Sequence, residues 1–188
     1  MHATLCDILY ELVQNAVEAK ATVITVDYLE DENTITCCVG DDGCGMTPEE
    51  MKQATDPFYT NGQKHAHRRV GLGLAFASQL AETVGGQFLL DSRKDEGTSL
   101  ALVLPRHHVD MPPLGDLPYL FAQLMIFDGE YELLIHRRYN DFSYRVIRSE
   151  LRKSVGSLED SEGFSLVKYY FEKLEEEVKE ATYGKNHA

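Results

Sequence analysis

The chain has 188 residues, of which 43% are hydrophobic and 26% charged, and its formal net charge at pH 7 is −13. This composition is typical of a soluble globular protein with one core and an appendage, and the acidic charge argues against nucleic acid as a partner. The longest apolar run, 117–127, is too short to span a bilayer and the N-terminus has no secretory signal, so we expect a cytoplasmic protein without a membrane partner.

Hydrophobic periodicity divides the first 105 residues into helices and strands. Three segments have a helical spacing of apolar residues or a helix-start signal: 3–19, a short helix from Thr47-Pro48, and 71–84. Four segments have strand-like composition: 22–29, 33–39, 87–92 and 98–104. Loops are expected at 41–45 and 56–70. This order predicts an α/β two-layer sandwich, with a mixed sheet that is covered by helices on one face.

A proline-rich segment, 107–118, is expected to link a domain over 1–106 to a C-terminal region over 119–188. We predict that this region is a small α+β unit whose hairpin completes an edge of the N-terminal sheet. The predicted strands and helices are 119–127 and 131–138 around Asp128-Gly129, a helix capped by Asp141 and ended by Gly156, and a helix from about Phe164.

The four cysteines, Cys6, Cys37, Cys38 and Cys44, have no CxxC spacing and no histidines at zinc-ligand spacing. Cys37 and Cys38 are neighbours on a predicted strand, so their side chains point to opposite faces and cannot easily chelate one ion. We therefore expect buried, reduced thiols.

The first predicted helix carries Glu11, Asn15 and Glu18 on one face, offset from its apolar stripe. A carboxylate in such a set can orient and deprotonate a water molecule. An amide oxygen one turn away can complete the shell of a Mg²⁺ ion that keeps water and phosphate as its other ligands. Taken alone, the same pattern is that of a solvated helix face.

A second motif, Asp41 to Met46, follows a predicted strand directly. An aspartate at a strand end can accept a hydrogen bond from an exocyclic amine, which selects adenine over guanine. The glycines Gly43 and Gly45 allow a sharp turn and a close approach to a ligand. Tight turns and Ca²⁺-binding loops have similar sequence patterns, but the further oxygen ligands of a Ca²⁺ loop are absent from this segment.

A third motif, Gly71-Leu72-Gly73-Leu74, opens a predicted helix. Glycines at a helix N-terminus leave backbone N–H groups available to phosphate, which the helix dipole also favours. The motif is neither a P-loop nor a Rossmann turn, because no Lys-Ser/Thr follows it and a loop precedes it. Downstream, Glu96-Gly97-Thr98 puts a hydroxyl at the start of the last strand.

The order and spacing of these motifs resemble the ATP-binding Bergerat fold of the GHKL superfamily, which comprises histidine kinases, DNA gyrase B, heat-shock 90 chaperones and mismatch-repair ATPases. The resemblance covers about residues 3–105. The segment 11–19 is most similar to the mismatch-repair and gyrase version of the first box, whereas 56–60 and 71–74 are similar to the histidine-kinase version. The C-terminal part resembles small stand-alone bacterial ATP-binding proteins found near iron-hydrogenase genes.

This resemblance implies ATP and Mg²⁺ as cofactors and a role for each matching residue. Glu11 would be the general base, Asn15 the Mg²⁺ ligand, and Asp41 the partner of the adenine amine. Gly43 and Gly45 would shape the adenine pocket and Thr98 would support it. The other residues that the resemblance places around the nucleotide are Glu18, Met46, Leu72 and Leu74.

The resemblance also implies an ATP lid over 58–73, with Gly71 and Gly73 beside the phosphates. Arg69 occupies the position of the first glycine of the family's GxGLG box, so it either contacts a phosphate or faces solvent. Lys64 is the nearest candidate for the lysine by which gyrase-like relatives reach the γ-phosphate, and it is alternatively a solvent-exposed residue.

Three functions share such a pocket. The first is slow Mg²⁺-dependent ATP hydrolysis by a nucleotide-dependent regulatory protein that binds ATP and ADP and acts on a protein partner. The second is a stand-alone kinase, like the anti-sigma-factor kinases, and the third is a non-hydrolysing nucleotide-binding module. A histidine kinase needs a phospho-acceptor helix hairpin, normally before such a domain, and we expect none before Met1, so autophosphorylation on a helical histidine is not expected. Tyr169, Tyr170 and Phe171 either pack within the chain or form a homodimer seam.

Overall fold

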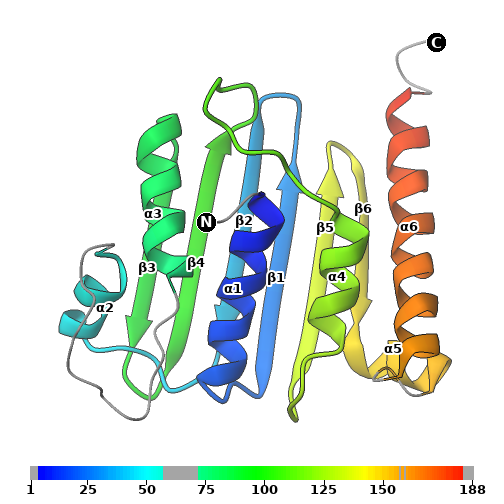
Figure 1. Cartoon of the computed structure of the whole chain (residues 1–188), viewed down its shortest axis with the longest axis horizontal. Coiled ribbons are helices and arrows are strands. Elements are labelled where there is room, and N and C mark those ends of the chain that lie inside the picture. The colour runs from blue at the N-terminus through cyan, green and yellow to red at the C-terminus, as the bar shows by residue number, and fades with distance from the viewer. Residues whose placement is uncertain (1–3, 57–71, 157, 159, 184–188) are drawn as a thin grey trace.

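The computed structural model describes residues 4–56, 72–156, 158 and 160–183 (Figure 1). Its strands are β1 (Val23–Glu30), β2 (Thr34–Asp41), β3 (Gln87–Arg93), β4 (Gly97–Pro105), β5 (Glu132–Tyr139) and β6 (Phe142–Ile147). Its helices are α1 (Leu5–Glu18), α2 (Pro48–Ala54), α3 (Gly73–Val84), α4 (Leu117–Met125), α5 (Arg148–Val155) and α6 (Ser161–Tyr183).

The strands form a six-stranded sheet in the order β3-β4-β2-β1-β5-β6. β1 pairs with β5 in parallel, and the other neighbouring strands pair antiparallel. Figure 1 shows α1, α3 and α4 side by side on one face of this sheet. The predicted α/β two-layer sandwich is therefore confirmed, and one sheet runs through the N-terminal and C-terminal parts of the chain.

Strand side chains alternate between the helix-covered face and an open face, as the pleat requires. On β2, Cys37 is fully buried under the helices whereas Cys38 faces the open side and is half-buried. The prediction that these two thiols point to opposite faces is confirmed. The expectation of burial holds for Cys6 and Cys37, while Cys38 and Cys44 are only half-buried.

Aromatic side chains join the C-terminal helices to the sheet. Phe121 on α4 lies with its ring centroid 5.4 Å from that of Phe171 on α6, and 6.4 Å from that of Tyr28 on β1. All three side chains are almost completely buried. Tyr169 and Tyr170 are 57% and 42% exposed, so of the three consecutive aromatic residues on α6 only Phe171 packs in the core.

The prediction of a strand over 119–127 is wrong, because α4 occupies this segment. Asp116 is its N-cap and accepts a hydrogen bond from the backbone N–H of Tyr119 at 2.9 Å, and Pro118 lies in the first turn. The large buried side chains repeat with helical spacing: Leu117, Leu120, Phe121, Leu124 and Met125. The capping and the spacing favour a helix over the strand that the apolar composition had indicated.

The prediction of a helix beginning at Asp141 is also wrong, since β6 starts at Phe142. Tyr139 pairs with Phe142, and Asn140 between them has a positive φ of 50°. Asparagine tolerates this left-handed conformation, so the two residues 140–141 form a tight hairpin turn. The helix that does end at Gly156 is α5, as predicted for its C-terminal boundary.

The proline-rich segment is anchored to the start of α1. Pro113 O accepts from the backbone N–H of Leu5 at 2.9 Å, and Leu114 O accepts from that of Cys6 at 3.0 Å. Thr4 and Asp7 form a capping box at the same helix end. Because the first N–H groups of a helix have no partner within it, these bonds fix the position of α1.

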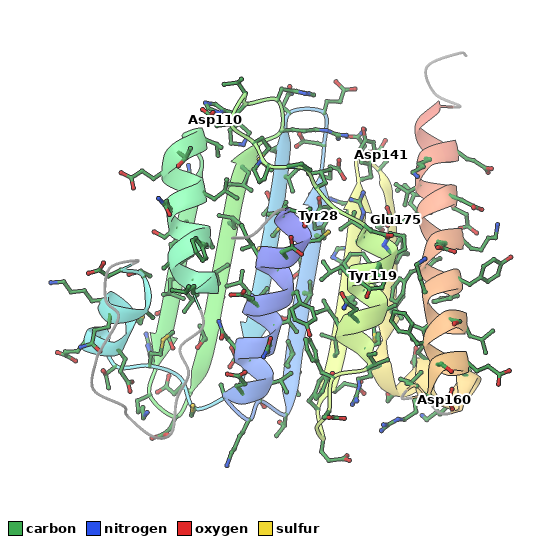
Figure 2. All side chains as sticks on the ribbon, viewed as in Figure 1. Tyr28, Asp110, Tyr119, Asp141, Asp160 and Glu175 are labelled. Atoms are coloured by element: carbon green, nitrogen blue, oxygen red, sulfur yellow. The ribbon has the colours of Figure 1, made fainter. Side chains whose placement is uncertain are left out.

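A buried ion cluster ties α6 to the ends of β1 and β5. Arg137 Nη2 lies 2.7 Å from Glu30 Oε2, and Arg137 Nε lies 3.2 Å from Glu175 Oε1. Glu30 also pairs with Arg106 at 2.6 Å, and the Tyr144 hydroxyl donates to Glu175 at 2.6 Å. Figure 2 shows Glu175 on the side of α6 that faces α4 and the sheet.

Candidate functional site

A cleft lies between α1, the ends of β2 and β4, and the start of α3. It is lined by Leu12, Asn15, Ala16, Glu18, Ala19, Val39, Asp41, Met46, Leu74, Thr98 and Leu100. Six of these residues belong to the predicted site: Asn15, Glu18, Asp41, Met46, Leu74 and Thr98. The structure thus brings together residues from four sequence segments, of which Asn15 and Thr98 are 83 positions apart in the sequence.

Asp41 stands at the end of β2, directly across from Thr98 on β4. Its Oδ1 accepts a hydrogen bond from the backbone N–H of Gly43 at 2.8 Å, which holds the carboxylate at the head of the turn. The cleft is otherwise mostly aliphatic where these two side chains face it. A carboxylate beside a hydroxyl in such a wall suits a ligand that donates hydrogen bonds there.

Two positions of the turn after Asp41, Gly43 and Gly45, leave no space for a side chain. A Cβ on Gly43 would lie 2.8 Å from Ala19 Cβ, so the turn packs directly on the end of α1. Gly45 has a positive φ of 54°, and a Cβ there would lie 1.7 Å from Arg93 O. The two glycines therefore let the backbone of this turn approach the end of α1 and the β3–β4 hairpin.

Asp42 does not line the cleft. Its carboxylate accepts from Thr22 Oγ1 at 2.6 Å, Thr22 N at 2.7 Å and Val23 N at 2.9 Å, which fastens the start of β1. These bonds, chiefly that from the Thr22 hydroxyl, hold the pKa of Asp42 below its usual range. The two adjacent aspartates thus have separate surroundings.

We expect Asp42→Ala to lower the melting temperature near neutral pH. A depressed folded-state pKa means that the ionised carboxylate stabilises the fold above its unfolded pKa of about 3.8, and that this contribution is lost as the pH falls further. The melting-temperature difference from wild type should therefore be constant above about pH 5 and shrink below pH 4. Asp91→Ala, at an exposed position of β3, is the control. A difference that grows in acid would contradict this account.

Glu11 lies beside the cleft, against the first turn of α3. A Cβ added to Gly73 would be 3.0 Å from Glu11 Cβ and 3.2 Å from Glu11 Oε2, so only a glycine lets α3 begin this close to the carboxylate. Leu72 precedes the helix and is 49% exposed. The structure therefore brings the predicted base next to the predicted phosphate-binding end of α3.

Lys64, Arg69 and Gly71 lie outside the described residues. One residue that the sequence did not point to is Ser92 on β3, whose buried hydroxyl contacts both the turn after β2 and the start of β4. The sequence signal that could have pointed to Ser92 is a polar residue at an inward-facing position of a strand.

The sequence matches the model of one protein family over residues 2–108, which is more than half of the chain. The model describes histidine kinase-, DNA gyrase B- and HSP90-like ATPases. The chain belongs to this ATPase family. The matched segment contains α1, the glycine turn, α3 and the β3–β4 hairpin, and so the whole cleft.

Two relatives and one solved structure illustrate the match. Heme sensor protein HssS of Staphylococcus saprophyticus is 34% identical over 97 residues, which are 50% of this chain and 21% of that protein. Sporulation kinase E of Bacillus subtilis is 28% identical over 105 residues, 54% of this chain and 14% of that protein. The catalytic domain of histidine kinase ThkA is 23% identical, covers 53% of this chain and 63% of that one, and has a TM-score of 0.39. This chain therefore spans less than a quarter of the length of these two relatives.

ATPases of this family typically bind ATP with Mg²⁺, and Asn15 fits such an ion. Its side chain lines the cleft, and its amide nitrogen is buried with no hydrogen-bond partner in the part of the chain that the structure describes. Buried amides are normally hydrogen-bonded, so this one retains capacity for a ligand, and its oxygen is a ligand type that Mg²⁺ accepts. Among the described residues, no three His, Cys, Asp or Glu side chains lie close enough together to hold a metal ion.

Among residues 4–56, 72–156 and 160–183, no helix is long and apolar enough to cross a membrane.

Proposed function

We propose that the protein binds ATP with Mg²⁺ in the cleft, hydrolyses it slowly, and acts as a nucleotide-dependent regulator of a protein partner. The observation that carries the proposal is the convergence of Asn15, Asp41 and Thr98 on one cleft within the segment that matches the ATPase family. Asp41 would accept from the adenine amine, and Asn15 would ligate Mg²⁺.

In this proposal the nucleotide lies with its base at the glycine turn and its phosphates toward α3. The N-terminus of α3 supplies backbone N–H groups and the positive end of a helix dipole to the phosphates. Leu74 and Met46, which line the cleft, would contact the base and ribose. Mg²⁺, when bound, would neutralise phosphate charge in the transition state.

Glu11 would act as the general base. A water oxygen attacks the γ-phosphorus while Glu11 takes one of the water protons; the bond to the bridging oxygen breaks, and ADP and phosphate leave. The support for this role is the position of the Glu11 carboxylate against Gly73, at the end of α3 where the phosphates would lie.

We expect Glu11→Gln to reduce phosphate release from ATP by about a hundredfold or more, because the amide cannot accept the proton. ATP affinity should change less than about threefold, since Glu11 is not among the residues that line the cleft. Single-turnover phosphate release and calorimetric binding on the same preparations separate the two effects. Glu82→Gln, at an exposed position of α3, is the matched control. Equal release by Glu11→Gln and wild type would exclude Glu11 as the base.

A second candidate function is transfer of the γ-phosphoryl group to a protein, which is favoured by the similarity to proteins named as kinases. Incubation with γ-labelled ATP, with and without cell lysate, distinguishes the outcomes. Free labelled phosphate supports the ATPase and a labelled protein supports the kinase. Label that stays on ATP supports a binding module that turns nucleotide over negligibly.

A further inference from the structure

Ser92 lies behind the cleft wall, on β3, and is 6% exposed. Its Oγ is 2.8 Å from the backbone nitrogen of Met46, 2.9 Å from the carbonyl oxygen of Gly97, and 2.9 Å from Thr98 Oγ1. Met46 belongs to the segment that follows Asp41, and Gly97 and Thr98 form the start of β4. One buried hydroxyl therefore connects both polar parts of the wall.

The three contacts determine where the hydroxyl protons point. A serine hydroxyl has one proton to donate and two lone pairs with which to accept. Met46 N–H can only donate and Gly97 O can only accept, so Ser92 receives from the first and gives its proton to the second. The third contact is a hydrogen bond only if Thr98 donates to the remaining lone pair of Ser92.

This assignment leaves the Thr98 hydroxyl with no proton for the cleft. Thr98 lies opposite Asp41 in the β2–β4 pairing, and both line the cleft. An ionised Asp41 carboxylate only accepts, and its Oδ1 already receives the Gly43 N–H. At Asp41 and Thr98 the wall thus presents only lone pairs, and a bound ligand or a bridging water has to supply the protons there.

We propose that Ser92 is a positioning residue that sets the purine selectivity of the cleft by fixing Thr98 as a hydrogen-bond acceptor. The inference rests on the proposed function. A 6-aminopurine presents N–H donors to this wall, whereas a 6-oxopurine presents a carbonyl oxygen, so that lone pairs face lone pairs. A bridging water can give one proton to Thr98 and the other to the N1 lone pair of adenine. N1 of a 6-oxopurine carries its own proton, so it cannot accept the second proton of this water.

Calorimetry with Mg²⁺ present tests the inference by comparing the affinities for ATP and for inosine triphosphate. These two nucleotides differ in this edge of the base. Wild type should prefer ATP by about a hundredfold or more, because the acceptors of Asp41 and Thr98 leave the oxo group unpaired. Ser92→Ala frees the Thr98 hydroxyl to rotate and donate, so the preference should fall about tenfold. Ser92→Thr keeps a hydroxyl and should restore most of it.

The comparison is made again with Thr98→Val, alone and combined with Ser92→Ala. If Ser92 acts through Thr98, adding Ser92→Ala to Thr98→Val should change the ratio of the two affinities less than about twofold. Because both ligands are measured on the same protein, lower stability of a variant cancels in this ratio. Two results would overturn the inference and leave Ser92 with only a structural role. One is an affinity ratio in Ser92→Ala equal to that of wild type; the other is an equal change of the ratio with and without the Thr98 hydroxyl. Failure of wild type to bind ATP would instead refute the proposed function itself.

Discussion

Asp41→Asn should weaken ATP binding about a hundredfold while leaving the fold intact. The Gly43 N–H is 2.8 Å from Asp41 Oδ1, so an asparagine would turn its single oxygen toward Gly43 and its amide nitrogen toward the cleft. The adenine amine would then meet a donor instead of a charged acceptor, and such a lost charge-assisted bond is worth about 1.5–3 kcal/mol before the donor–donor contact is added. Calorimetry with Mg²⁺·ATP measures the affinity.

The neighbouring aspartate is the matched control for this variant. Asp42→Asn changes the same side chain one position later, but Asp42 binds Thr22 and Val23 outside the cleft. We expect it to retain ATP affinity within about threefold, since it removes no contact to the ligand. Equal losses in the two variants would show that the effect comes from the loop and not from a contact between Asp41 and the base.

Arg137→Met should lower the free energy of unfolding by about 3 kcal/mol, near the low end for breaking a buried ion pair. Arg137 is 3% exposed, and its removal leaves the buried carboxylates of Glu30 and Glu175 without their shared cation. Each keeps one partner, Arg106 or Tyr144, which limits the loss. For a chain of this length the melting temperature should fall by about 6–12 °C.

Urea unfolding followed by circular dichroism measures this change. Arg138→Met is the matched control, because Arg138 is the next residue of β5 and is exposed on the open face of the sheet. Substitutions at such surface positions usually change stability by less than about 0.5 kcal/mol. Similar losses in the two variants would mean that the buried cluster contributes no more than a surface charge.

The N-terminal fold could be predicted from sequence because its local signals agree with its tertiary contacts. Val23–Glu30 and Thr34–Asp41 are strands with β-branched residues and a polar turn, and Thr47-Pro48 is a capped helix start. Once the helices and strands are placed, the positions of the motif residues can be predicted as well, because Asp41 ends a central strand that lies beside the end of α1.

The C-terminal region was harder to predict because its signals are short and ambiguous. The run 117–127 is apolar enough for a strand, and the decisive signals are the Asp116 cap and the spacing of single residues. The parallel pairing of β5 with β1 was beyond local reasoning, since Thr25 and Leu134 are register partners 109 positions apart. Ser92 was missed for a similar reason, because its three partners come from segments that only the fold brings together.

The most direct test of the central claim is calorimetric titration of the wild-type protein with ATP in the presence and absence of Mg²⁺. We predict saturable binding of one ATP per chain, tighter with Mg²⁺, because Asn15 and the end of α3 would hold the metal and phosphates while Asp41 and Thr98 hold the base. Absence of saturable binding to the folded protein at millimolar ATP, with Mg²⁺ present, would contradict the account.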